Sequence, residues 1–267
     1  MARLDQLINN ADKHREIAYK KALKLVESHL SAIHKTMEFA ARNSGYSGFD
    51  SAINSIRRSD FEAVYLQLYD KVGRYIADAD YAAYNLHLKR AGFSFVDAVW
   101  RSYLERAMRN TIIASFITKV TDTTRKLYRD ILQEAAAQNL APLEIARLLV
   151  SKRATLIKAR SLTIARTESG YAASIGTEFA ADRIESEIGV QMYTVWNHYP
   201  HKDPRETHIA LNKHYVKRGE TFNVDGTVFM KYPHDPAGGA NNNVNCGCNH
   251  VYATEDVLKE IGLWSVV

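Results

Sequence analysis

Residues 190–196 read VQMYTVW, a run of β-branched and aromatic side chains that is typical of a β-strand. The chain before this run carries apolar residues at helical spacing, whereas the chain after it contains brief β-prone runs separated by polar turns. These later segments are a short helix at 206–212, YVKR at 215–218, TVFM at 227–230, PAGGANNN at 236–243 (expected to be a flexible loop), the strand-like CNHVYAT at 248–254, and a last small helix, EDVLKEIGL, at 255–263. The predicted fold class is therefore α+β.

The part of the chain before residue 190 is predicted to be helical. Apolar residues recur at three-, four- and seven-residue steps from Leu4 to Ala40, and the turn-forming run NSGYSG at 43–48 is expected to end this first helix. Thr121 or Asp122 is expected to cap a later helix. The predicted helices span residues 4–42, about 51–76, about 79–91 with a break at Gly92, about 95–118, about 121–139, 142–152 (with Pro142 in its first turn) and about 154–186.

This change of pattern predicts a domain boundary near residues 140–150. We expect an all-helical region over 1–140 and a smaller domain of mixed helix and strand over 141–267. Each helix of the first region needs a partner for its apolar stripe. An internal helical bundle would provide such partners, and so would docking of the long N-terminal helix on another protein, and the sequence leaves both interpretations open.

The composition is that of an ordinary globular chain, because 46% of the 267 residues are apolar and 24% are charged. It excludes a wholly disordered, collagen-like or disulfide-dense protein. No window of about eighteen consecutive apolar residues occurs, which argues against a membrane span. The first residues also lack the apolar core of a secretory signal. We therefore expect folding in a reducing cytoplasm and no membrane partner.

The net charge of +5 is unevenly distributed along the chain. Residues 1–164 hold 26 Lys and Arg against 17 Asp and Glu, which gives +9, whereas residues 165–267 hold 9 against 13, which gives −4. The basic half could face double-stranded DNA or an acidic protein. The alternative is a set of solvated helix faces with a mild excess of Lys and Arg.

Histidine and cysteine are concentrated near the C-terminal end, where residues 198–250 contain both cysteines and six of the ten histidines: His198, His201, His208, His214, His234 and His250. Imidazole and thiolate are preferred ligands of zinc, and Cys246, Cys248 and His250 alternate, so a strand would project them from one face. His208 or His214 could supply a further ligand. Because Cys-x-Cys is not the spacing of a standard zinc finger, two small thiols with histidines in surface loops are the alternative. A disulfide between these cysteines would be strained.

A second polar group, Asp203, Arg205 and His208, has the pattern D-x-R-x-x-H. At helical spacing Arg205 and His208 share one face, and an acid just before them could cap the helix. We interpret the group as a buried polar network that fixes a loop-rich segment. The enzymatic alternative makes His208 a general base oriented by Asp203. Arg166 and Glu168 are likewise expected to pair with neighbouring segments, and their role is expected to be structural.

Five short motifs follow one another in the second half of the chain. They are Ile164-Ala165-Arg166-Thr167-Glu168 on a helix, Trp196 at the end of a strand, Asp203-x-Arg205-x-x-His208, Pro233-x-Asp235-Pro236, and Asn245-Cys246-x-Cys248. In this order the region from about residue 125 to residue 252 resembles the phage Mu F-like minor head protein family, also called phage head morphogenesis proteins. The helical region before it carries no matching motif. The chain departs from the family at Gly247, where the family commonly has Arg.

The resemblance implies a non-enzymatic minor structural protein of a tailed-bacteriophage head. Such proteins associate with the portal protein or the inner side of the capsid built by the major capsid protein, they assist head assembly, and some accompany the packaged DNA. The chain would then fold in the host cytoplasm and reside in the virion, inside the capsid or at the portal vertex. We expect no catalytic residue and no cofactor, with zinc bound by Cys246, Cys248, His208 and His250 as the alternative. We also expect a structural polar network of Arg166, Glu168, Asp203, Arg205, His208, Asp235 and Asn245.

The alternative function belongs to another class, a metal-dependent hydrolase that acts as a nuclease or a peptidase. It would be built on Asp203, His208, Cys246 and Cys248. Such an enzyme needs an open coordination position on the metal and a carboxylate that activates water. DNA binding by the basic half would be a secondary property of the first function, and it should weaken steeply with salt.

Overall fold

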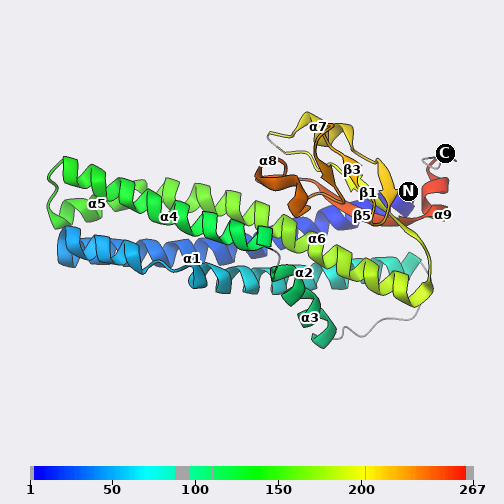
Figure 1. Ribbon diagram of the computed structural model, residues 1–267, viewed down its shortest axis with the longest axis horizontal. Helices are drawn as coiled ribbons and strands as arrows, with labels where there is room; N and C mark the ends of the chain where they lie inside the picture. Colours follow the sequence, from blue (N-terminus) through cyan, green and yellow to red (C-terminus); the bar gives the residue numbers. More distant parts are fainter. Residues whose placement is uncertain (1–2, 88–96, 110, 202, 263–267) are drawn as a thin grey trace. The chain divides into compact units, whose positions relative to one another are not determined.

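The computed structural model describes residues 3–87, 97–109, 111–201 and 203–262, and within helices it leaves out the side chains of 85–87 and 111–112. The chain is mostly helical with a few short strands near its C-terminal end, so the predicted α+β class is confirmed (Figure 1). The elements are α1 (Arg3–Ser55), α2 (Arg58–His87), α3 (Asp97–Met108), α4 (Thr111–Ala137), α5 (Pro142–Arg153), the π-helical turn η1 (Ala154–Ala159), α6 (Arg160–Ile188), β1 (Met192–Asn197), α7 (Glu206–Ala210), β2 (Tyr215–Lys217), β3 (Phe222–Asn223), β4 (Phe229–Met230), the 3₁₀ turn η2 (Pro236–Gly238), α8 (Gly239–Asn243), β5 (Asn249–Thr254) and α9 (Glu255–Glu260). Within the described ranges, no helix has the length and apolar character that crossing a membrane requires.

The chain divides into two compact units, each assembled from separate segments. Unit 1 consists of Met1–Ala22, Leu68–Ala107 and Arg166–Val267, and unit 2 consists of Leu23–Gln67 and Met108–Ala165. Helices α1, α2 and α6 therefore each contribute residues to both units. The boundary predicted at residue 140 falls within unit 2, between α4 and α5, which contact each other.

Helix α1 is longer than predicted, because the NSGYSG run bends the helix without ending it. Gly45 has φ 58° and ψ −141°, a conformation almost restricted to glycine, and the helix resumes after it and continues to Ser55. The actual break lies at Ile56 and Arg57, where the Asp60 carboxylate accepts a hydrogen bond from the Arg57 N–H at 3.3 Å. Helix α2 then runs from Arg58 to His87 without a break at residues 77 and 78, where the two predicted helices were separated. The predicted break at Gly92 lies outside the described residues.

Helix α4 passes through Thr121 and Asp122, so the helix start predicted there is wrong. Thr121 is buried and donates its hydroxyl to the carbonyl oxygen of Ile117, one turn earlier, at 2.8 Å. A threonine that bonds back in this way lies inside a helix and does not cap one. The two predicted helices at about 95–118 and 121–139 are instead divided near Arg109, between α3 and α4.

The helices predicted at 142–152 and about 154–186 both form, and the second begins with a π-helical turn. Helix α5 begins at Pro142, and the Glu144 carboxylate accepts a hydrogen bond from the Ala141 N–H at 2.8 Å, which satisfies a donor at the helix start. The turn η1 joins α5 to α6. Helix α6 ends where Gly189, with φ 65°, donates its N–H to the Glu185 carbonyl oxygen at 2.8 Å.

The predicted strand at 190–196 forms β1, the centre of a three-stranded antiparallel sheet in the order β2-β1-β5. Strands β1 and β5 lie side by side in Figure 1. Val195 lies opposite Tyr215 on β2 and Val251 on β5. The sheet packs against the beginning of α1 and parts of α2 and α6, so segments from both ends of the chain share one core. That core includes Leu4, Leu7, Ile8, Tyr81, Tyr84, Ala180, Ala181, Ile184, Val195, Val251, Tyr252 and Leu258.

A second, smaller core in unit 1 lies beneath the loop-rich segment between β1 and β5. It contains both cysteines and a few large side chains, namely Trp196, Leu211, Phe222, Val224, Met230, Cys246 and Cys248. The run PAGGANNN, expected to be a flexible loop, instead forms η2 and α8. The Asp235 carboxylate starts this structure by accepting the Ala237 N–H at 2.9 Å.

Candidate functional site

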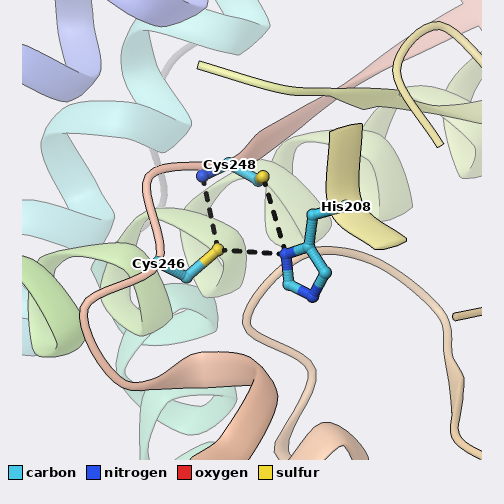
Figure 2. A group of neighbouring side chains, drawn as sticks. All are labelled: His208, Cys246 and Cys248. Carbon is cyan, nitrogen blue, oxygen red and sulfur yellow. Dashed lines mark hydrogen bonds between the residues drawn. The ribbon is translucent and has the colours of Figure 1, made fainter. Parts of the chain in front are cut away.

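His208, Cys246 and Cys248 meet in the interior of unit 1, with the imidazole facing both sulfur atoms (Figure 2). The Nδ1 atom of His208 lies 3.5 Å from the Sγ of Cys246 and 3.7 Å from the Sγ of Cys248. His208 comes from α7, and the cysteines come from the loop between α8 and β5. The structure thus brings together three of the four residues that the sequence suggested as zinc ligands.

His250 and His214 do not join this cluster. His250 lies on β5, where its Nε2 is 3.6 Å from the Glu178 Oε1 and its ring stacks on Tyr232 with a centroid distance of 5.0 Å. His214 is exposed. The expectation that Cys246, Cys248 and His250 share one strand face is wrong, because β5 begins only at Asn249 and the cysteines precede it in an irregular loop.

The hydrogen bonds of Asn242 determine which nitrogen of His208 carries the proton. The Asn242 Nδ2 donates to the Gly238 carbonyl oxygen at 3.1 Å, so its Oδ1 is the atom that faces the His208 Nε2, at 3.3 Å. An amide oxygen only accepts, and the proton of the neutral ring therefore belongs on Nε2. The lone pair of Nδ1 is then directed at the two sulfur atoms. The Trp196 indole packs edge-on against the imidazole, with a centroid distance of 5.2 Å.

A buried arginine from the first helix reaches the same loop. The guanidinium of Arg15 donates to the carbonyl oxygens of Cys248 and Cys246, the latter at 3.4 Å, and to the Nε2 of His234 at 2.9 Å. A guanidinium has no acceptor, so the Nε2 of His234 must accept and its Nδ1 carries the proton. Sequence reasoning missed Arg15 and this role of His234. The available signal was a charged residue within the apolar stripe of α1, between Ala11 and Ala18.

The two thiols have opposite tendencies to ionise. A hydrogen bond from Cys248 holds the pKa of Cys246 well below its ordinary value although burial opposes this, and the contact with His234 acts in the same direction. The hydrogen bond to Cys246 and then burial raise the pKa of Cys248. Burial lowers the pKa of His234 and keeps its ring neutral. The two pKa shifts are opposite because the thiols share one hydrogen bond, and the guanidinium of Arg15 lies beside them.

The IARTESG motif on α6 holds the loop that precedes the cysteines. Arg166 donates to the Oδ1 of Asn245 at 2.9 Å, and the Thr167 hydroxyl accepts the N–H of Asn245 at 2.9 Å. Asn245 has φ 59°, a left-handed conformation that Asn tolerates better than most residues, and the two bonds hold it there. Glu168 is buried and accepts a hydrogen bond from the Tyr69 hydroxyl at 2.8 Å. These hydrogen bonds connect α6 to α2 and to the loop before the cysteines, as a structural polar network would.

Two of the three remaining motif residues also bond to backbone. Arg205 donates to the carbonyl oxygens of Asn241 at 2.6 Å and Val244 at 2.9 Å, near the end of α8. Asp235 accepts the Lys231 N–H at 2.7 Å in addition to its capping bond. Asp203, in contrast, is exposed, and Arg205 is the residue at the N-cap of α7. The expectations that Asp203 caps this helix or orients His208 are therefore wrong.

The space beside Gly247 is occupied by a histidine. A Cβ atom at this position would lie 2.7 Å from the Nδ1 of His201 and 3.1 Å from the carbonyl oxygen of Tyr199. The His201 Nδ1 lies 3.1 Å from the same carbonyl oxygen, and its ring centroid is 6.2 Å from that of His198. An arginine in place of Gly247 would require this histidine to move.

Of the motif residues that suggested a family resemblance, Arg166 and Thr167 thus contact Asn245, and His208 faces both cysteines, whereas Asp203 joins none of these contacts. No model of a known protein family matches the chain, and comparison with curated proteins and with solved structures finds no similar protein either.

Proposed function

We propose that this chain is a minor structural protein of a tailed-bacteriophage head, which associates with the portal protein or the major capsid protein during head assembly and remains in the virion. The supporting observation is that motifs far apart in the sequence contact one another. Arg166 bonds to Asn245, and His208 faces Cys246 and Cys248. Short motifs that resemble a family by chance have no reason to meet in space, so their contacts strengthen the resemblance.

The burial of the site favours a structural role over a catalytic one. His208 is 1% exposed, and both cysteines have no exposed surface. A substrate would reach these atoms only if the segment over them opened. The hydrolase alternative also needs a carboxylate next to the metal, and its candidate, Asp203, is exposed and bonds to none of the cluster residues described.

Unit 2 supplies the candidate docking region for a capsid or portal partner. It exposes large apolar side chains on its helices, among them Phe39 at 70% and Val150 at 49% exposure. Solvent-exposed aromatic and aliphatic side chains are favourable anchors in protein interfaces. The basic charge of residues 1–164 suits double-stranded DNA as a secondary partner.

The test is incorporation of the full chain into heads. The chain is co-expressed with the portal and major capsid proteins of the same phage, and procapsids are purified. We expect the wild-type chain in the particles and a loss of at least about tenfold, equivalent to about 1.4 kcal/mol of binding, for Phe39→Glu combined with Val150→Glu. The matched control is Phe229→Glu in unit 1, which alters a side chain of similar exposure, 51%. Deleting the N-terminal helices would also remove Leu4 and Arg15, which α1 contributes to unit 1. Point variants are therefore preferable to truncation.

A wild-type chain that is absent from procapsids and does not bind isolated portal protein would contradict the proposal. Nuclease and peptidase assays with added zinc, manganese or magnesium address the alternative. Activity that disappears in His208→Ala, with the fold retained, would favour the hydrolase.

A further inference from the structure

The distances from the His208 Nδ1 to the two cysteine sulfur atoms match an edge of a zinc coordination tetrahedron. With Zn–S bonds of about 2.3 Å and Zn–N bonds of about 2.0 Å, tetrahedral angles place a sulfur and a nitrogen ligand about 3.5 Å apart. The observed separations from the His208 Nδ1 are 3.5 Å to the Cys246 Sγ and 3.7 Å to the Cys248 Sγ. All three ligand atoms lie within 4.8 Å of one another.

We propose that His208 Nδ1 and the thiolates of Cys246 and Cys248 bind one Zn²⁺ ion. The ring nitrogens of His198 and His201 lie outside this group of three, and we propose that one of the two imidazoles turns toward the ion and supplies the fourth ligand. The inference does not rest on the proposed role in a phage head. Two thiolates and imidazole are the donors that zinc prefers, and two thiolates balance the double charge of the ion. Any proton still on Cys248 passes to solvent as the metal binds.

The surroundings of these ligands are already those of a metal site. Asn242 directs the lone pair of the His208 Nδ1 toward the sulfur atoms, which is the tautomer a metal requires. The backbone N–H of Cys248 points to the Cys246 Sγ at 3.4 Å, a contact that supports a thiolate.

The histidine pair is the favoured source of the fourth ligand. The Nε2 atoms of His198 and His201 are both buried and have no hydrogen-bond partner in the described structure. The His201 Nδ1 can donate to the Tyr199 carbonyl oxygen, which leaves the lone pair on its Nε2. A Cβ atom at Gly247 would lie 2.7 Å from the His201 Nδ1, so the ring of His201 lies beside the residue between the two cysteines. His234 is excluded because Arg15 donates to its Nε2 and the proton remains on its Nδ1.

A metal here would stabilise the segment between β1 and β5, whose apolar core is small. The ion would link α7 to the loop before β5, positions 38 and 40 residues apart in sequence. Because the unfolded chain lacks the assembled site, metal binding would contribute directly to folding. We therefore expect a structural zinc ion, held within the protein and closed to substrates.

The experiment uses the full chain with its thiols reduced. After removal of metal with a chelator, Co²⁺ is added as a spectroscopic probe, and Zn²⁺ is then titrated against a chromophoric chelator. We expect one ion per chain, sulfur-to-cobalt charge-transfer bands, and the visible bands of tetrahedral Co²⁺. Zinc at about 100 times its Kd should raise the Tm by about 5–10 °C. His208→Ala should weaken zinc binding at least about tenfold, whereas His214→Ala, at an exposed histidine near the same segment, should leave it unchanged.

The wild-type measurement decides the proposal even if a cysteine variant fails to fold. Folded, reduced wild-type chain that binds neither Co²⁺ nor Zn²⁺ would overturn it, and so would equal affinity in His208→Ala and wild type. The double variant His198→Ala/His201→Ala tests the fourth ligand. A tenfold weaker binding supports it, and unchanged affinity with unchanged visible bands removes this pair from the site.

Discussion

Units 1 and 2 bury different kinds of polar groups. The buried polar side chains described in unit 2 are few and mostly small, and the hydroxyls of Thr121 and Thr124 bond to carbonyl oxygens one turn earlier in their own helix. Unit 1 buries a guanidinium, carboxylates, imidazoles and amides. Their partners are often distant in sequence, as with Arg15 and Cys248, which are 233 residues apart. Local apolar spacing is therefore sufficient to build much of unit 2, whereas unit 1 depends on specific polar contacts between distant segments.

The sharpest test of this difference is Arg15→Met in unit 1. The substitution leaves the Cys246 and Cys248 carbonyl oxygens and the His234 Nε2 without their donor in a buried site. We expect a loss of about 3–5 kcal/mol in the free energy of unfolding, measured by urea denaturation. Lys24→Met, at an exposed position on the same helix, should change it by less than about 0.5 kcal/mol. Equal effects of the two variants would remove Arg15 from its structural role.

The corresponding test in unit 2 removes a buried apolar side chain. Leu149 on α5 has no exposed surface, and Leu149→Ala should cost about 2–4 kcal/mol through lost burial and the cavity left behind. Hydrogen exchange should then increase mainly in unit 2, while Arg15→Met should increase it mainly in unit 1. Leu143→Ala, 47% exposed on the same helix, is the control. If both variants raised exchange equally in both units, the two units would behave as one cooperative structure.

The kink in α1 allows a backbone test within unit 2. Gly45→Ala places a side chain on a conformation with φ 58° and ψ −141°, 3.3 Å from the Cγ of Pro142. We expect a loss of about 2 kcal/mol, visible as a lower urea midpoint with an unchanged slope. Ser47→Ala, two residues later at an exposed helical position, should have little effect. If Gly45→Ala left the urea midpoint unchanged, the helix would be able to straighten without losing stability.

The smallest expected effect concerns pH and unit 1. Burial raises the pKa of Asp80 to about 7, and the Thr177 hydroxyl donates to its carboxylate at 2.6 Å. The folded state holds this proton more tightly than the unfolded state, so the stabilisation is complete below about pH 4 and is lost as pH rises through 7. Asp80→Asn should therefore be more stable than wild type at pH 8, by about 1 kcal/mol because the residue keeps some exposure. Thermal unfolding at pH 5 and pH 8 measures this, with Asp122→Asn in unit 2 as the control. A wild-type Tm that does not fall relative to Asp80→Asn between these pH values would contradict the assignment.

Much of the secondary structure could be predicted because its signals are local. Pro142 marks a helix start, and the run at 190–196 has the composition of a strand, and both are found where expected. The wrong helix boundaries were predicted at residues that are compatible with two different backbone arrangements. Gly45 permits a kink as well as a stop, and Thr121 can bond backward within a helix as well as cap one. At Gly45 the chain kinks and the helix then resumes, and at Thr121 helix α4 continues without a break.

The sequence by itself determined the α+β class, because the spacing of apolar residues that is typical of helices or strands can be seen within short stretches of the chain. It also indicated the residue types of the candidate zinc site, since Cys246, Cys248 and His208 stand out by composition. Only the tertiary structure decided which histidine faces the thiols, because the choice between His208, His214 and His250 depends on where α7 and β5 lie. It alone revealed Arg15 beside the cysteines. No local period encodes a contact between the first helix and a loop near the other end of the chain, so such a contact is settled only when the chain folds.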